Sequence, residues 1–116
     1  MKNYRLTIIT ENQKSLDKAN KLGDLICNTL NTRGRFEAIK YDKFVNSYKI
    51  ELSGQISNSE NSISESIELT DRIVNYWAVE FNRAENEIAL LFNKTEFSNF
   101  RKQEFNVIVW ANFEMY

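Results

Sequence analysis

The chain has no histidine, no proline and only one cysteine among its 116 residues. Without histidine it lacks the commonest general base, the commonest zinc ligand and the side chain that titrates near neutral pH. A single cysteine, Cys27, excludes an internal disulfide and is typical of a reducing compartment. We therefore predict a cytoplasmic protein that binds no metal ion or other cofactor.

Long apolar runs are absent as well. No stretch approaches the roughly 18 residues that a membrane span needs. The first residues lead into an alternating pattern and not into the apolar core of a secretory signal. Apolar residues still make up 42% of the chain and aromatic residues 13%, which is enough to bury a core. We predict one globular domain over residues 1–116 with no membrane partner.

Glycine is scarce, and neither a Walker A loop nor a GxGxxG loop is present to hold a phosphate. A nucleophilic triad would lack its histidine base. We therefore predict no catalytic residue. A small enzyme that uses carboxylates and tyrosines for acid–base chemistry stays open as an alternative hypothesis.

Alternation of apolar and polar residues predicts strands over residues 4–10, 36–41, 48–56 and 105–113. The clearest is 48–56, whose one apolar and one polar face are typical of an antiparallel sheet covered on one side. The last strand is apolar on both faces, which predicts a central position in the sheet. One face is expected to carry Phe105, Val107, Val109, Ala111 and Phe113, and the other Ile108 and Trp110.

Apolar residues at spacings of three and four predict two amphipathic helices. The first is expected to begin after a capping residue, for which Asn12 and Ser15 are the candidates, and to end near Gly34. Gly23 lies inside it, and a close approach of the helix to the sheet would explain that glycine. The second is expected to begin at a capping box formed by Ser62 and Glu65.

Residues 77–93 fit two structures. Continued as a helix, the second helix would reach about 48 Å, which is too long for a domain of this size. Read as strands, the same residues form a β-hairpin with its turn at 83–86. We favour the hairpin. The whole pattern then predicts an α+β fold with a mainly antiparallel sheet of four to six strands and two helices on one face. Its order, β-α-β-β-α-(β-β)-β, is compatible with a ferredoxin-like arrangement.

Charge is distributed unevenly although the net charge is only −1. Residues 1–57 carry ten basic and six acidic side chains, whereas residues 58–87 carry seven acidic and two basic ones. Acids in the first turn of a helix explain part of this segment without a partner. The remainder predicts a surface for a basic partner. The acidic residues predicted to bind it are Glu80, Glu85, Glu87, Glu65, Glu68 and Asp71.

Aromatic residues outnumber the positions available on the predicted core faces. The surplus consists of Trp77, Trp110, Phe97, Phe100 and Tyr116. Because tryptophan and tyrosine are enriched at protein interfaces, we add Trp77 and Trp110 to the predicted partner-binding residues.

Together these features favour a small non-catalytic binding protein. The specific hypothesis is a bacterial immunity or inhibitor protein that occludes the active site of a basic toxin domain, such as a nuclease. Nucleic acid is not expected as a partner, because the polar face of strand 48–56 has no aromatic residue on which a base could stack. The alternative is a homo-oligomeric structural or regulatory subunit, for instance a homodimer that pairs through the terminal strand.

Overall fold

The computed structural model describes residues 2–31, 36–56, 61–82 and 87–115. The chain begins with β1 (Lys2–Thr10), α1 (Leu16–Thr29), β2 (Phe36–Lys40), β3 (Tyr48–Ile56) and α2 (Ser62–Asp71). It continues with β4 (Val74–Asn75), β5 (Ala78–Asn82), β6 (Glu87–Asn93), β7 (Asn99–Phe100), the 3₁₀ helix η1 (Gln103–Val107) and β8 (Ile108–Met115). Neither helix in these ranges has the length and apolar character needed to cross a membrane.

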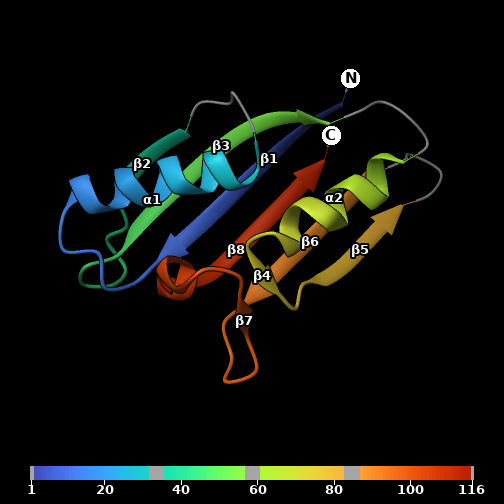
Figure 1. The fold of residues 1–116 in the computed structure, drawn as a ribbon. Coiled ribbons are helices and arrows are strands. Elements are labelled where there is room, and N and C mark those ends of the chain that lie inside the picture. Colours follow the sequence, from blue (N-terminus) through green and yellow to red (C-terminus); the bar gives the residue numbers. More distant parts are fainter. Residues whose placement is uncertain (1, 32–35, 57–60, 83–86, 116) are drawn as a thin grey trace.

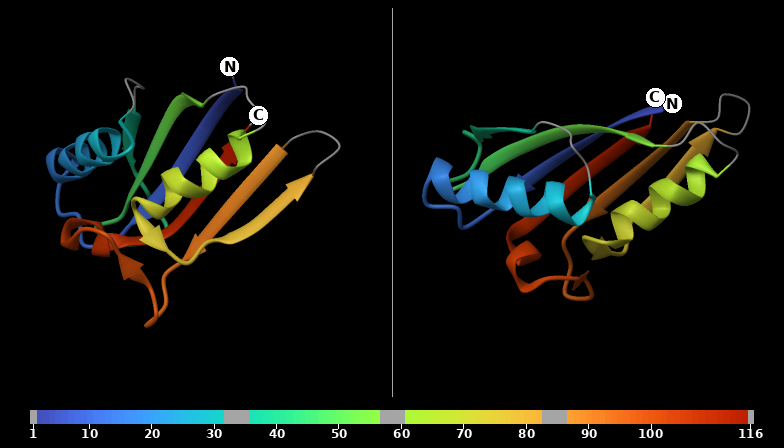
Figure 2. Two further views of the ribbon diagram at one scale, coloured as in Figure 1. Left: turned by 45° about the vertical axis from the view of Figure 1, so that its right-hand side comes forward. Right: turned by 45° about the horizontal axis from the view of Figure 1, so that its top comes forward.

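Six strands form one antiparallel sheet in the order β2-β3-β1-β8-β6-β5, and β4 pairs with β7 in a small second sheet. Both helices lie on the same side of the large sheet (Figure 1 and Figure 2). The predicted α+β fold is therefore confirmed. The order β2-β3-β1-β8 is that of the split βαβ arrangement, and the hairpin of β5 and β6 extends this sheet beyond β8.

The ambiguous segment 77–93 forms the hairpin. β5 and β6 pair in a continuous antiparallel register from Ala78 opposite Leu91 to Asn82 opposite Glu87. The alternative of one long helix is wrong, since α2 ends at Asp71. The expected turn, residues 83–86, lies outside the described residues.

The core lies between the helices and the sheet. Tyr4 of β1 is 1% exposed, and its ring stacks on Phe113 of β8 with 5.0 Å between the ring centroids. Gly54 of β3 pairs directly with Tyr4. A Cβ atom at Gly54 would lie 2.5 Å from Cζ and 2.6 Å from Cε1 of the Tyr4 ring. The glycine is therefore required by close packing of this ring against the strand.

A β-bulge interrupts the alternation in β8. Ile9 pairs with Trp110, but the next residue, Thr10, pairs with Ile108, so Val109 is the extra residue. Because of this shift Ile108 points to the helices and is fully buried. The prediction that Ile108 shares a face with Trp110 is wrong for that reason. The position of β8 in the middle of the sheet is confirmed.

The first part of the predicted terminal strand is not a strand. Residues 103–107 form η1, and Phe105 is buried in the core from this short helix. Val107 is half-buried and packs against the core, but it does so from η1 and not from the predicted strand.

The start of α1 is as predicted, because the Ser15 hydroxyl accepts a hydrogen bond from the Lys18 N–H at 3.2 Å. The end differs. Leu30 is the C-cap, and Asn31, with φ of 53°, takes the left-handed position expected of Gly34. Asparagine tolerates this conformation better than most residues. Gly34 itself lies outside the described residues.

Two further expectations concern the helices. Gly23 lies against the ring of Phe36 in β2, where a Cβ atom would overlap the ring, so the predicted close approach is confirmed. The predicted capping box of α2 is wrong, because the N-cap lies one residue before Ser62. Asn61 is the N-cap and accepts from the Glu65 N–H at 2.8 Å through its carbonyl oxygen. Ser62 is the first residue inside the helix and is buried.

Candidate functional site

One face of the large sheet carries no helix, and no other described element covers it (Figure 2). Side chains on it alternate with those of the core, and we call it the open face. Its described members are Asn3, Arg5, Thr7, Ile9, Glu37, Ile39, Lys49, Glu51, Ser53, Gln55, Ala78, Glu80, Glu87, Ala89, Leu91, Asn93, Trp110, Asn112 and Glu114.

Trp110 lies on β8, an inner strand of the sheet, near one end of the open face. It pairs with Ile9 of β1 on one side and with Asn93 of β6 on the other. Leu91, two residues from Asn93 on the same strand, is its diagonal neighbour, a position within reach of an aromatic ring. Trp110 is half-buried and Leu91 is exposed. With Ile9, which pairs with Trp110 and is buried, these two side chains form an apolar centre on a surface of mixed character.

A group of carboxylates lies further along the same strands, beyond Leu91 and toward the opposite end from Trp110. Ala89 of β6 pairs with Glu80 of β5 on one side and with Glu114 of β8 on the other. Glu87 is two residues from Ala89 and points to the same face. Since neighbouring strands lie about 4.8 Å apart, the Cα atoms of Glu80 and Glu114 are about 10 Å apart. We call Glu80, Glu87 and Glu114 the acidic corner.

The acidic corner is only partly neutralised. Glu114 forms an ion pair with Arg5 at 3.3 Å and accepts a hydrogen bond from Asn112 at 2.8 Å. For Glu80 and Glu87, no ion pair with a described residue is formed. As far as the described residues go, these two carboxylates have no counter-charge, which suits a cationic group from outside the chain.

The other predicted acidic residues are elsewhere. Glu85 lies outside the described residues. Glu65, Glu68 and Asp71 belong to α2, on the opposite side of the sheet from the acidic corner. Glu68 pairs with Arg72 at 2.7 Å, as helix neighbours do. The structure thus brings Glu80 and Glu87 together and separates both from the acids of α2, so one small surface cannot include both groups.

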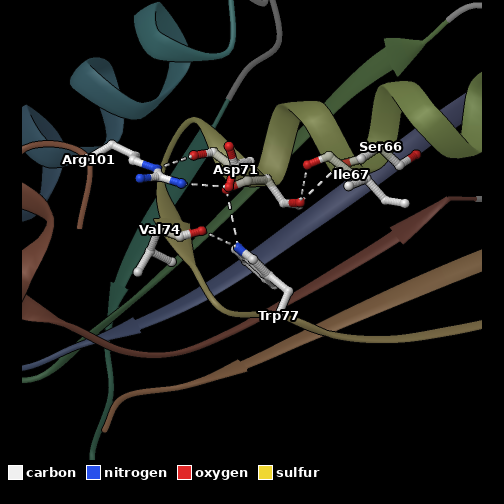
Figure 3. A network of polar contacts seen from close by, with 7 residues as sticks. Ser66, Ile67, Asp71, Val74, Trp77 and Arg101 are labelled. Atoms are coloured by element: carbon white, nitrogen blue, oxygen red, sulfur yellow. Dashed lines mark hydrogen bonds and ion pairs between the residues drawn. The ribbon is translucent and has the colours of Figure 1, made fainter. Parts of the chain in front are cut away.

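Trp77 is used inside the molecule. Its indole N–H donates to the carbonyl oxygens of Val74 at 2.7 Å and Thr70 at 3.2 Å (Figure 3). Its ring packs against Phe92 with 5.7 Å between centroids. Because the polar end of the side chain is already bonded, the geometry gives Trp77 a structural role in joining the start of β5 to the end of α2.

Arg101 closes the same end of α2. Its Nε–H donates to the carbonyl oxygen of Asp71 at 2.9 Å, and its Nη2 lies 2.8 Å from the Asp71 carboxylate (Figure 3). Its backbone N–H donates to the carbonyl oxygen of Ile73 at 2.9 Å. The segment after β7 is thereby fastened to the helix, and the predicted partner-binding role of Asp71 stays a prediction.

A groove of about 550 Å³ lies between α1 and η1. Its floor is apolar, with Leu22, Leu25 and Val107, and Lys18 and Lys21 lie on its rim. Lys21 is paired with Asp17 at 3.4 Å. Glu104 also lines the groove, and this mixed lining indicates no particular ligand.

The described residues also offer little for metal or nucleophilic chemistry. No group of three potential metal-ligating side chains occurs among them. Cys27 is buried, with 8% of its surface exposed. Burial, and to a lesser degree the nearby carboxylate of Asp24, raises the pKa of the Cys27 thiol. The thiol therefore stays protonated at neutral pH, where only a thiolate would act as a nucleophile.

Sequence reasoning missed two members of this site. Leu91 alternates with the buried Leu90 and Phe92, and that alternation would have placed it on an outer face. Glu114 lies beyond the predicted end of the last strand at residue 113, so its proximity to the hairpin could not be anticipated. Comparison with protein-family models, with curated proteins and with solved structures finds no match to this chain.

Proposed function

We propose that this chain is a stoichiometric binding protein whose open face engages a basic protein domain. The observation that carries the proposal is the position of Glu80 and Glu87. They are diagonal neighbours on β5 and β6, on an uncovered sheet face without a described counter-charge, and Glu80 is also a diagonal neighbour of Leu91. An apolar centre with charged groups at its border is the usual composition of a protein interface.

The charge of the open face supports a cationic partner. Its carboxylates outnumber its cations, with Glu37, Glu51, Glu80, Glu87 and Glu114 against Arg5 and Lys49. Opposite charges on two proteins raise the association rate and exclude partners of the wrong sign. The same sign repels phosphate groups, which speaks against nucleic acid as the ligand.

Within this class we propose an immunity or inhibitor protein of bacterial type that neutralises a basic toxin domain. A domain that acts on an anionic substrate, as a nuclease does, needs a cationic active site. Carboxylates held on a rigid sheet can occupy such a site in place of the substrate, and the surrounding face then blocks access. Inhibition would require one copy of this chain for each copy of the toxin domain.

The test is to produce the chain together with the protein encoded beside its gene, and to measure binding kinetics and inhibition at equimolar ratio. The variant Glu80→Gln/Glu87→Gln should lower the association rate about tenfold at low salt, and the loss should shrink as salt screens the charges. Glu65→Gln/Glu68→Gln, with the same charge change on α2, should stay within about twofold of wild type. Equal kinetics for wild type and both variants would contradict the proposal.

Self-association through the terminal strand, which the sequence left open, finds no support. β8 is paired along one edge with β1 and along the other with β6. Its backbone groups have no free edge for a second copy. A homodimer would need another surface, and the mass of the free chain in solution, measured by light scattering, shows whether one forms.

A further inference from the structure

The outer edge of β5 is an open strand edge. Among the described residues β5 pairs only with β6, and the ribbon shows it at the border of the sheet (Figure 1 and Figure 2). Ala78, Val79 and Glu80 are all exposed. Because a strand at an edge leaves half of its N–H and C=O groups without a strand partner, such an edge is a template for one more strand.

The opposite edge of the sheet, β2, is better protected. α1 packs onto it through the contact between Gly23 and Phe36. Its exposed positions are Ile39 and two residues of opposite charge, Glu37 and Lys40. Proteins block edge pairing with lysine, proline or a bulge. β5 has neither lysine nor proline, and its described register with β6 has no bulge.

The two sides of β5 differ in character. On the helix side Val79 is 46% exposed. Glu65 and Leu69 of α2 line a pocket with Ile56 of β3, so the other flank of α2, with Ile67, faces the hairpin. Ile67 is 45% exposed. The helix side of the edge is therefore apolar, whereas the open face beside it carries Glu80 and Glu87.

We propose that β5 accepts an extended segment of the partner protein as a seventh strand of the sheet. This segment would place apolar side chains over Val79 and Ile67 and, at the alternate positions, lysine or arginine beside Glu80 and Glu87. Main-chain hydrogen bonds provide the affinity in such strand addition, and the alternating side chains provide the specificity. The inference rests on the proposed function and adds the mode of binding.

A second copy of this chain fits the edge poorly. Two-fold antiparallel pairing centred on Glu80 would place the two Glu80 carboxylates directly opposite each other, which is unfavourable. It would also double the negative charge of the open face. The chemistry of the edge therefore favours a basic partner over self-pairing.

The probe is a labelled peptide of alternating valine and lysine, about as long as β5, titrated against the intact chain by fluorescence anisotropy. It should bind at least about tenfold more tightly than a peptide of alternating valine and glutamate. N-methylation of alternate peptide amides on the bonding edge should abolish binding, because it removes the donors that complete the ladder. Hydrogen exchange should slow at amides of β5 when the unmodified peptide binds.

The variant Val79→Lys should weaken peptide binding at least about tenfold, since it places a charge of the wrong sign on the apolar side of the edge. Val45→Lys is the matched control, because Val45 is 86% exposed in the turn between β2 and β3, outside the open face and away from β5. It should change the affinity less than about twofold. Circular dichroism and thermal unfolding show whether both variants fold.

The remaining outcomes separate the two proposals. Binding that survives N-methylation and Val79→Lys, or slower exchange at β2 instead of β5, would overturn strand addition. A dimer of the free chain that Val79→Lys dissolves would assign the edge to a second copy and overturn it too. If Glu80→Gln/Glu87→Gln weakens the natural complex while β5 amides stay unprotected in it, the proposed function stands and the strand-addition mode fails.

Discussion

Replacement of Gly54 by alanine tests how tightly β3 is packed. Alanine is ordinarily the better strand residue, by roughly 0.5–1 kcal/mol, because glycine loses more conformational freedom on folding. Here the added methyl group would lie 2.5–2.6 Å from two carbon atoms of the Tyr4 ring. Carbon atoms in contact normally lie about 3.5–4.0 Å apart, so the ring would have to move by about 1 Å.

The ring has little room for this movement, since Tyr4 is buried and stacks on Phe113. Overpacking a well-packed core costs about 1–3 kcal/mol. After the conformational gain is subtracted, Gly54→Ala should lower the free energy of unfolding by about 1–2 kcal/mol. For a chain of this length that is a fall in Tm of about 4–8 °C.

The assay is urea and thermal unfolding of four proteins: wild type, Gly54→Ala, Tyr4→Leu and the double variant. Tyr4→Leu removes the ring that the methyl group would meet, so in that background Gly54→Ala should be neutral or stabilising. The coupling between the two substitutions should reach about 1–2 kcal/mol. A higher Tm for Gly54→Ala alone, or the same cost in both backgrounds, would show that the close approach does not determine this position.

Two further changes test other parts of the structure. Lysine in place of Arg101 cannot make both contacts that the guanidinium makes with Asp71, so Arg101→Lys should lower the free energy of unfolding by about 1 kcal/mol, measured in urea. An unchanged midpoint of urea unfolding would show that these two contacts do not stabilise the fold. Cys27 should react slowly with a thiol reagent in the native state and fast in denaturant, and rapid native reaction would contradict its burial. Burial raises the pKa of the Cys27 thiol in the folded protein above its value of about 8.5 in the unfolded chain. The contribution of the buried, protonated thiol to folding stability is therefore complete below the unfolded pKa and is lost as pH rises through the folded pKa. Wild type should therefore lose more stability than Cys27→Ala above about pH 9, measured by urea unfolding.

The pattern of apolar and polar residues was sufficient to predict an element whose structure depends on its own residues and not on distant parts of the chain. Strict alternation predicted β3 with its observed bounds, Tyr48–Ile56. Length argued against one straight helix over residues 62–93 and favoured the hairpin, without deciding between them. The bulge at Val109 was beyond such reasoning, because it depends on how β8 pairs with β1, about a hundred positions earlier in the chain. The residue with positive φ after α1 was predicted at Gly34, but it is Asn31. Asparagine, like glycine, tolerates the left-handed conformation, so glycine alone did not mark the position.

The site was predictable in part. Charge counting identified Glu80 and Glu87, which do share a face. It also grouped them with Glu68 of α2, because position along the chain does not tell on which side of the sheet a residue lies. Trp77 and Trp110 were equivalent in sequence. Only the structure distinguishes an indole bonded to the end of a helix from one on an uncovered sheet face.

The central position of β8 has a consequence for synthesis of the chain. β8 is the last strand of the large sheet to leave the ribosome, yet it is the one that joins β1 to β6. Until it emerges, the nascent chain holds two separate ladders, β2-β3-β1 and β6-β5, whose inner edges and apolar faces are exposed. The sheet can close only after translation has passed residue 115, and the pairing of β1 with β8 then spans almost the entire chain, a contact that slows folding. During that interval the inner edge of β1, with Leu6 and Ile8 beside it, is the segment most open to chaperones and to other nascent chains.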